Sequence, residues 1–355
     1  MHPHDLFGEA VREVRSRNGR PFIGFFGLLL VLGTLVAADL SDVRGVFESY
    51  NKFVASGATT MTATSIGAVS GSECDRLSQA GVVAGAGAIR TGKPLRLRAL
   101  PDVQVPFFEV TPGFAELLAG RNTAQSAGLI LSKELAEDLS ARIGTTLVTQ
   151  TGAAEVAAIF SYPDDGRAAG LGWAALSITP PTRPYDQCWV DIPSSDDHLT
   201  SLPMASLAGA DSDATLAQLN SSLGSTFDFV QRIEDRPTRL APLAAFLGSL
   251  IVVAAMNGLR RIEIASALHV GVTRRTLASR SVIECMAVAV PACLTALAAG
   301  WCFVALQPDV GDTVLQFLPA WRIAGAGLVG ALVGSLIGVL HIRERDLYRH
   351  YKSRS

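Results

Sequence analysis

Residues 240–259 read LAPLAAFLGSLIVVAAMNGL, twenty consecutive residues without an acid or a base. A helix of this length spans about 30 Å, the thickness of the hydrocarbon core of a bilayer. Residues 282–306 and 323–341 are similarly apolar, apart from Glu284, and a shorter apolar run covers residues 21–38. The sequence therefore predicts a helical membrane protein with four transmembrane helices, and it excludes a soluble enzyme and a disordered chain.

The charges between the apolar segments predict the topology. Arginines and one lysine concentrate in residues 1–20, 260–281 and 342–355, whereas residues 307–320 contain two aspartates and no base. Because short loops rich in Lys and Arg stay in the cytoplasm, both termini are expected to be cytoplasmic in a bacterial cell (inner) membrane. Residues 39–239 then lie outside, with 15 basic and 23 acidic side chains. This acidic balance does not favour nucleic-acid binding.

Two features of the span boundaries have a second interpretation. Arginines followed by the apolar run 21–38 are also typical of a cleaved secretory signal peptide, but we favour an uncleaved membrane anchor. Arg236 and Arg239 lie outside, close to the second span, which departs from the charge rule. Long arginine side chains at such a boundary can extend to the headgroups, so the predicted orientation stands.

The region between the first two spans reads as an extracytoplasmic mixed α/β domain inserted on helical stalks. Apolar residues at helical spacing continue past Ala38 and recur in residues 213–233, so both stretches are predicted to be stalk helices. Ser72 and Ser132 are expected to open short helices, the second over residues 132–144. The predicted boundaries are a cytoplasmic amphipathic helix at 1–20, spans at 21–38, 240–259, 282–306 and 323–341, the external domain at 39–239 with an outer lobe at about 112–180, a cytoplasmic loop at 260–281, an external loop at 307–322 and a cytoplasmic tail at 342–355.

Small residues and cysteines suggest two structural contacts. Gly330, Gly334 and Gly338 follow small-xxx-small spacing on the fourth span, which lets another helix approach closely, either within the chain or between chains. Cys74 and Cys188 both lie in the external region, where the oxidising compartment permits a disulfide. The sequence alone leaves open whether these two cysteines are bonded.

Three tempting motifs do not indicate catalysis or metal binding. The stretch Gly87–Lys93 fits G-x-x-x-x-G-K, but Pro94 replaces the Ser or Thr that would bind magnesium, so we predict a turn and no ATPase in this chain. Ser194–His198 contains residue types of a hydrolase, but consecutive residues such as SSDD are typical of a helix N-terminus. His2 and His4 are too few to predict a metal site.

The loop between the second and third spans is the strongest functional feature. Residues 260–286, RRIEIASALHVGVTRRTLASRSVIECM, are basic and helical in pattern. Ile262, Ile264, Leu268 and Val270 make this loop more apolar than a solvated loop needs to be, which favours a docking helix for a cytoplasmic partner. Glu284 lies one turn after Arg280, so it sits either at headgroup depth or in contact with the adjacent cytoplasmic helix.

These residues resemble a known family. The pattern Arg260-Arg261-x-Glu263-Ile264, then Gly271-x-Thr273-Arg274-Arg275, then Glu284, is similar to the loop of MacB/FtsX-type ABC transporter permeases. The topology, with one span, a large external domain and three further spans, resembles that family over nearly the whole chain. Similar segments in the external domain are Phe114–Arg121, Leu131–Ala136 and Ile143–Leu147.

The resemblance implies a non-catalytic permease subunit of an ABC transporter. Its partners would be a separate cytoplasmic ATPase, which binds ATP and Mg, a second permease chain that is identical or different, membrane lipid, and in some cases an extracytoplasmic protein. ATP hydrolysis would move the loop and drive export or outer-leaflet extraction of a substrate by mechanotransmission. A rival interpretation is a regulatory permease that activates an external partner, such as a cell-wall hydrolase, without transport. The residues expected to couple to the ATPase are Arg260, Arg261, Glu263, Ile264, Leu268, Gly271, Arg274 and Arg275, supported by Glu284.

Overall fold

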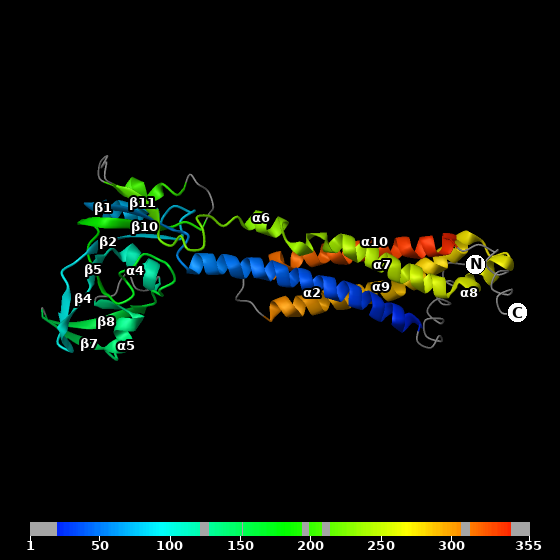
Figure 1. The fold of residues 1–355 in the computed structure, drawn as a ribbon, viewed down its shortest axis with the longest axis horizontal. Coiled ribbons are helices and arrows are strands. Elements are labelled where there is room, and N and C mark those ends of the chain that lie inside the picture. Colours follow the sequence, from blue (N-terminus) through cyan, green and yellow to red (C-terminus); the bar gives the residue numbers. More distant parts are fainter. Residues whose placement is uncertain are drawn as a thin grey trace. The chain divides into compact units, whose positions relative to one another are not determined.

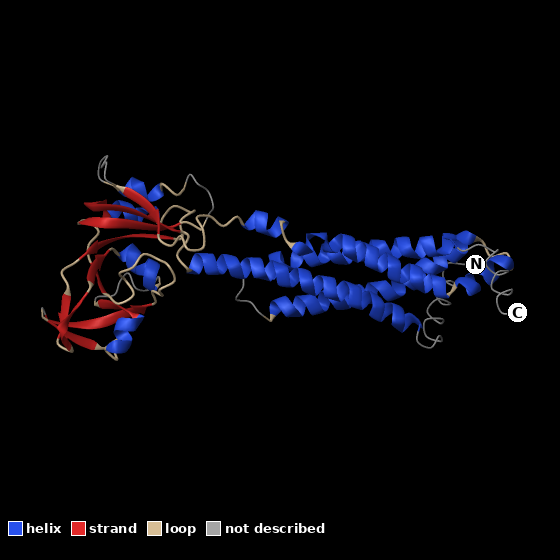
Figure 2. Cartoon of the chain, viewed as in Figure 1, coloured by secondary structure: helices blue, strands red, loops and turns tan. Residues whose placement is uncertain are grey.

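The computed structural model describes residues 20–120, 128–150, 152–193, 199–207, 214–306 and 313–341. The chain divides into two compact units, which we call the helical unit (residues 1–49 and 229–355) and the sheet unit (residues 50–228). Figure 1 traces the chain through both units, and Figure 2 shows that helices make up one unit and strands most of the other. Several predictions fall outside the described residues: the N-terminal amphipathic helix up to residue 19, the pair His2 and His4, the stretch Ser194–His198, and the tail 342–355.

Among its described residues, the helical unit contains four helices that are long and apolar enough to cross a membrane. They are α2 (Arg20–Ala55), α7 (Ala241–Leu259), α9 (Arg274–Ala305) and α10 (Thr313–His341). Shorter elements of this unit are α6 (Phe229–Glu234), η2 (Pro237–Leu240) and α8 (Arg261–His269). Together with the inserted sheet unit, these four helices confirm the predicted fold class.

Two helices begin earlier than the apolar segments that predicted them. Helix α9 begins at Arg274 rather than at residue 282, because Thr273 caps it by accepting a hydrogen bond from the Thr276 amide (3.4 Å). Helix α10 begins at Thr313, so residues 313–322, which were assigned to an external loop, are helical. Their apolar residues Val314, Phe317, Leu318 and Trp321 follow helical spacing, but Pro319 and Arg322 mask the pattern in a hydropathy average.

The helices pack through a core in which small residues alternate with large ones. Leu32, Val36 and Leu40 of α2 lie against alanines of α7, α9 and α10 and against Phe317. Gly330 and Gly334 of α10 contact α7 so closely that a Cβ atom at either position would lie 2.1 Å from the carbonyl oxygen of Phe246 or 2.6 Å from that of Leu250. The small-residue face of the fourth span therefore serves a contact within the chain.

The described residues of the sheet unit form eleven strands. In chain order they are β1 (Thr60–Ser70), β2 (Gly85–Thr91), β3 (Leu95–Leu97), β4 (Leu100–Val105), β5 (Phe107–Val110), β6 (Leu129–Ser132), β7 (Thr146–Thr149), β8 (Gly152–Phe160), β9 (Ala175–Ile178), β10 (Pro184–Asp191) and β11 (Thr215–Gln218). The spatial order is β11-β1-β10-β2-β5-β9-β6-β8-β7-β3-β4. The pairs β5–β9 and β6–β8 are parallel, whereas the other pairs are antiparallel.

Short helices cover this sheet: α3 (Gly71–Leu77), α4 (Pro112–Ala119), α5 (Lys133–Asp138) and the 3-10 turn η1 (Leu202–Ser206). Fully buried Phe114 of α4 contacts Trp189 of β10 edge to face, with ring centroids 5.0 Å apart. Cys74 of α3 and Cys188 of β10 form a disulfide in the structure, with their Cα atoms 5.8 Å apart. Both cysteines are buried, so this bond links α3 to strand β10 inside the protein.

Several local predictions in the sheet unit were wrong or only partly right. Ser70 rather than Ser72 caps α3, because β1 runs directly into the helix and Ser70 lies three residues before the Glu73 amide. Ser132 caps α5 as predicted, but the helix ends at Asp138 rather than near Gly144. The stretch Gly87–Lys93 mainly continues strand β2 instead of forming a turn.

The second stalk is the largest correction. Residues 213–233 were predicted to form a helix, yet Thr215–Gln218 is strand β11, which pairs with β1, and only Phe229–Glu234 is helical. Gly224 has a φ of +100°, which interrupts a helix, and the edge of β1 offers the segment backbone hydrogen bonds instead. The helix predicted to continue past Ala38 is present, because α2 runs without interruption to Ala55.

Candidate functional site

Helix α8 lies between α7 and α9 and is anchored along one face. Ile264, Ala265 and Leu268 are buried, and they form an apolar cluster with Leu277 of α9 and Val339 of α10. Ile264 and Leu268 were expected to contribute to a docking surface, but each is only 9% exposed. They therefore hold α8 against α9 and α10.

An ion-pair cluster fixes the start of α8. Glu284 of α9 accepts hydrogen bonds from Arg260, which joins α7 to α8, and from Arg280 at 3.0 Å. Arg260 also donates to Glu263 at 3.5 Å. Burial lowers the pKa of Arg260, but the hydrogen bond and the charge of Glu284 outweigh it and raise that pKa above its ordinary value. Of the two alternatives left open for Glu284, the structure shows the contact with the segment that begins α8.

Helix α8 ends in a C-terminal cap whose backbone conformation favours glycine at position 271. Gly271 has a φ of +93°, and its amide donates to the carbonyl oxygen of Leu268 (3.0 Å). The amide of Val272 donates to the carbonyl oxygen of Ala267 (3.1 Å). This pair of bonds is the Schellman arrangement, which needs a left-handed residue and therefore favours glycine. Thr273 then caps α9, so hydrogen bonds fix both the end of α8 and the start of α9.

The opposite side of α8 is exposed, apolar in part and basic. Ile262 is 56% exposed and Val270 is 83% exposed. We call these two residues, together with exposed Arg261, His269 and Val272, the α8 surface. Arg274 and Arg275 are also exposed, but they belong to the first turn of α9. The residues of this loop thus divide into an anchor, formed by Ile264, Ala265 and Leu268, which contacts the bundle, and the α8 surface, whose side chains are exposed.

A buried polar network lies behind the anchor, within the bundle. Asn257 of α7 donates to the backbone carbonyl of Ser335 on α10 (3.2 Å). The Ser281 hydroxyl of α9 lies within hydrogen-bond distance of Asn257 Oδ1 (3.3 Å) and of the Ser335 hydroxyl (3.0 Å). Gly338 leaves room for Asn257, because a Cβ atom there would be 2.6 Å from the amide nitrogen. These bonds join three helices at the end that carries α8, and no sequence pattern had indicated them.

The far end of the helical unit has its own buried ion pair. Arg236, in the turn before α7, donates to Asp39 of α2 at 3.2 Å, and Asp39 is only 2% exposed. The pair gives Arg236 a buried partner of opposite charge at the end of a membrane-length helix, where an unpaired charge would be costly. The sequence singled out Arg236 alone, and its contact with Asp39 depends on the tertiary structure.

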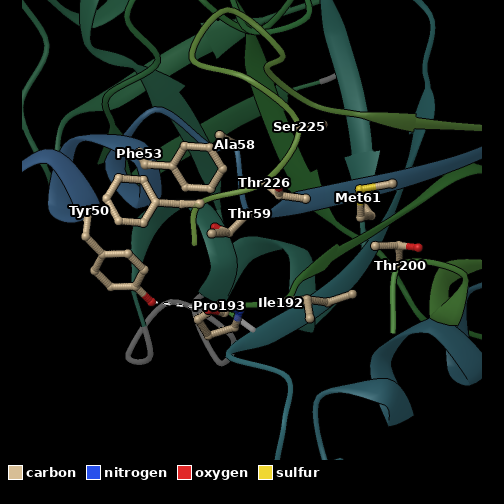
Figure 3. Close-up of a pocket in the computed structure, with 11 residues that line it drawn as sticks. Tyr50, Phe53, Ala58, Thr59, Met61, Ile192, Pro193, Thr200, Ser225 and Thr226 are labelled. Carbon is tan, nitrogen blue, oxygen red and sulfur yellow. Dashed lines mark hydrogen bonds between the residues drawn. The ribbon is translucent and has the colours of Figure 1, made fainter. Parts of the chain in front are cut away.

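A small pocket of the sheet unit is drawn in Figure 3. It has a volume of about 40 Å³, which suits one or two water molecules rather than a substrate. The Tyr50 hydroxyl donates to the backbone carbonyl of Pro193 (3.2 Å) at its rim. The lining residues are Tyr50, Phe53, Ala58, Thr59, Met61, Ile192, Pro193, Thr200, Ser225, Thr226 and Phe227.

Asp191 lies next to this pocket and should make the stability of the protein depend on pH. Burial raises the pKa of its carboxyl, although a hydrogen bond from Thr59 (2.5 Å) opposes the shift. A raised pKa means that the folded state loses stability as the pH rises through the ordinary aspartate range. We therefore expect Asp191→Asn to increase the thermal stability of the full chain at pH 7, and to lose this advantage below about pH 3.5.

Asp165→Asn is the matched control, because its effect on stability at pH 7 should have the opposite sign. The hydrogen bond from Arg167 lowers the pKa of Asp165, so this carboxylate stabilises the fold above the ordinary aspartate pKa and loses its contribution as the pH falls. Its replacement should lower stability at pH 7. The same direction of change in both variants, followed by circular dichroism on heating, would contradict the assignment.

The described residues contain no group of three or more His, Cys, Asp or Glu side chains that could hold a metal ion. In its described residues, the chain has four apolar, membrane-length helices and an inserted mixed α/β unit, and an ion-pair cluster holds the short helix α8 between two of these helices.

Comparison with known proteins adds structural matches only. No protein-family model matches the sequence, and no curated protein does so either. The chain is similar to the crystal structure of the periplasmic region of MacB from Actinobacillus actinomycetemcomitans, with 13% identity and a TM-score of 0.34, over 51% of this chain and 94% of that one. It is also similar to a domain of a protein described as a permease from Porphyromonas gingivalis, with 12% identity and a TM-score of 0.32, over 45% of this chain and 88% of that one.

Proposed function

We propose that this chain is the permease subunit of an ABC transporter of the MacB/FtsX type. The observation that carries the proposal is the construction of α8, a short helix whose apolar face is anchored to α9 and α10 while its basic and apolar opposite side is exposed. A helix anchored in this way can receive a push from a cytoplasmic partner and transmit it to the membrane helices. Its sequence is the part of the loop that resembles the family.

In this proposal α8 is the coupling helix, and both termini lie in the cytoplasm. A separate ATPase, which binds ATP and Mg, would contact Ile262 and Val270, with Arg261, Arg274 and Arg275 facing acidic groups of the partner. Closure of two ATPase subunits would move α8, and the ion pairs of Glu284 would carry the movement to α9. The sheet unit would then act on a substrate outside the membrane, with a second permease chain completing the complex.

Gentle detergent extraction of the tagged chain from its native membrane, followed by mass spectrometry, tests the proposal directly. We expect a co-purifying ATPase, and the number and identity of permease chains would distinguish a homodimer from a heterodimer. Recovery of the chain without any ATPase, under conditions that preserve other transporter complexes, would overturn the proposal. A stably bound external protein would instead favour the regulatory alternative.

The cap of α8 gives a sharper test of coupling. An alanine at position 271 would be held in a left-handed conformation, at a cost of about 1–2 kcal/mol, and should loosen the last turn of α8. We expect Gly271→Ala to leave the complex assembled but to abolish stimulation of the ATPase by the permease, and Glu263→Gln to act in the same direction. ATPase activity of the reconstituted complex is the measurement.

Gly258→Ala is the control for this experiment. Gly258 lies in α7, two residues before the loop, in ordinary helical conformation, and a Cβ atom there meets nothing within 4 Å. The control should keep full stimulation. If Gly271→Ala and Glu263→Gln also keep it, α8 is not the coupling element.

A further inference from the structure

Three buried oxygen atoms without a hydrogen-bond partner lie where α2 meets the segment that leads into α7, residues 229–240. They are Oδ2 of Asp39, Oδ2 of Asp42 and the hydroxyl oxygen of Thr238. Among the described residues, only one further buried side-chain nitrogen or oxygen lacks a partner, the hydroxyl of Ser249 on α7. Buried polar atoms are normally paired, so three unpaired oxygens in one part of the fold indicate a ligand.

Two contacts of α2 place both aspartates against this segment, within the helical unit. Phe47 contacts Phe229 edge to face, with ring centroids 4.9 Å apart. Asp39, which is only 2% exposed, accepts a hydrogen bond from Arg236 at its other oxygen, Oδ1, at 3.2 Å. Asp42 lies between these two contacts along α2, and it is on the same helix face as Asp39 because three residues separate them.

Thr238 is placed against α2 in the same way, from the side of the other segment. It belongs to η2 and follows Arg236, which contacts α2 through its hydrogen bond. Ala241, three residues after Thr238, shares a buried apolar cluster with Val36 of α2. The hydroxyl of Thr238 therefore lies between two contacts with α2, and it is buried there.

The charges at this place do not balance. The carboxylates of Asp39 and Asp42 face one buried guanidinium, that of Arg236, whose side chain is 10% exposed. Arg44 forms its own ion pair on α2 at 2.6 Å, and Arg239 is exposed. One negative charge is therefore left over, and a buried charge without compensation destabilises a fold. A bound cation with a single positive charge removes this imbalance.

The donor atoms indicate the class of cation. Carboxylate and hydroxyl oxygens bind hard cations, whereas transition metals favour nitrogen and sulfur ligands. A divalent ion would leave an excess positive charge. We propose that Oδ2 of Asp39, Oδ2 of Asp42 and the hydroxyl of Thr238 bind one monovalent alkali cation, Na⁺ or K⁺, which ties α2 to η2. The site needs no ATPase and no particular orientation in a membrane, so it is independent of the proposed function.

Thermal unfolding of the purified full chain in detergent tests this site. NaCl and KCl are each titrated against choline chloride, which keeps the ionic strength constant and supplies a cation too bulky for an enclosed oxygen site. We expect the unfolding temperature to rise and saturate with at least one alkali salt, by about 5 °C at a hundred times the dissociation constant. Equilibrium dialysis with the radioactive form of that cation should then give one bound ion per chain.

Two substitutions remove ligands while they keep the size of the side chain. Asp42→Asn removes the surplus charge, so it should abolish the response to alkali salts and should unfold at a higher temperature than the wild type in choline chloride. Thr238→Val removes a neutral ligand and should raise the half-saturating concentration about tenfold. Both variants retain the hydrogen bond between Asp39 and Arg236.

Each substitution has a matched control on the same unit. Ser249→Ala removes the other buried hydroxyl without a partner, on α7 rather than on η2. Glu48→Gln removes a carboxylate of α2 that is 44% exposed and already paired with Arg44. Both controls should respond to alkali salts as the wild type does.

Three results would overturn the proposal. Equal unfolding temperatures in NaCl, KCl and choline chloride would exclude a bound alkali cation. An unchanged response in Asp42→Asn would place the cation elsewhere on the chain. Stabilisation by calcium chloride without any response to the two alkali salts would show that the site holds a divalent ion. All three are measured without an ATPase, so they leave the proposed function to be judged by its own test.

Discussion

Glu284→Ala is expected to lower the free energy of unfolding of the helical unit by about 2–3 kcal/mol and to abolish stimulation of the ATPase. Glu284 is only 12% exposed and receives hydrogen bonds from Arg260 and Arg280. Removal of one partner from a fully buried ion pair destabilises a protein by about 3–5 kcal/mol, because a charge is left uncompensated. The effect should be smaller here, since both arginines are partly exposed.

The measurement is thermal unfolding of the purified chain in detergent, together with ATPase activity of the complex. Glu48→Ala is the control, because Glu48 is 44% exposed where it pairs with Arg44 on α2 at 2.6 Å, and pairs of carboxylates open to solvent contribute under about 1 kcal/mol. Truncation of Arg260 as well as Glu284 should restore part of the stability lost in Glu284→Ala. It should not restore stimulation of the ATPase. If Glu284→Ala unfolds and couples like the wild type, the ion-pair cluster does not hold α8.

Gly330→Ala should destabilise the helical unit by about 3 kcal/mol, although alanine is the better helix former. The new Cβ atom would lie 2.1 Å from the carbonyl oxygen of Phe246, and this contact is with the backbone of α7, which cannot rotate away. Overpacking of a core costs about 1–3 kcal/mol, and a clash with backbone belongs at the upper end of that range. Helices α7 and α10 must therefore separate.

Gly325→Ala on the same helix is the control, since a Cβ atom there has no neighbour within 4 Å. It should leave stability unchanged or raise it slightly, because alanine loses less backbone entropy than glycine. Resistance to unfolding by sodium dodecyl sulfate separates the two variants. Equal resistance would show that Gly330 does not lie against α7.

The membrane part of the fold could be predicted from sequence because it depends on local composition. Twenty apolar residues in a row form a helix in a bilayer whatever their neighbours are, since only internal hydrogen bonds can satisfy the backbone. Residues 240–259 therefore became α7 with nearly the predicted ends. The same argument failed for residues 313–322, where Pro319 and Arg322 lowered the average apolarity of a segment that is nevertheless helical.

The second stalk shows why periodicity was insufficient in the sheet unit. Leu216, Leu219 and Leu223 follow a period that a helix would use, but the backbone of 215–218 finds hydrogen-bond partners on β1. Pairing between residues about 155 apart in the chain cannot be read from either segment alone. The Ser70 cap likewise depended on where β1 ends, which the sequence of α3 does not reveal.

The sequence by itself determined that the chain has four spans, an inserted α/β unit and a short basic loop that is neither wholly polar nor wholly apolar. Only the tertiary structure decided which residues of that loop anchor α8 and which are exposed. Ile262 and Ile264 have the same chemical character, yet one is 56% exposed and the other 9%, because the position of α9 and α10 selects the face that is covered. Apolarity and charge are properties of a residue, whereas burial and pairing are properties of its neighbours in space.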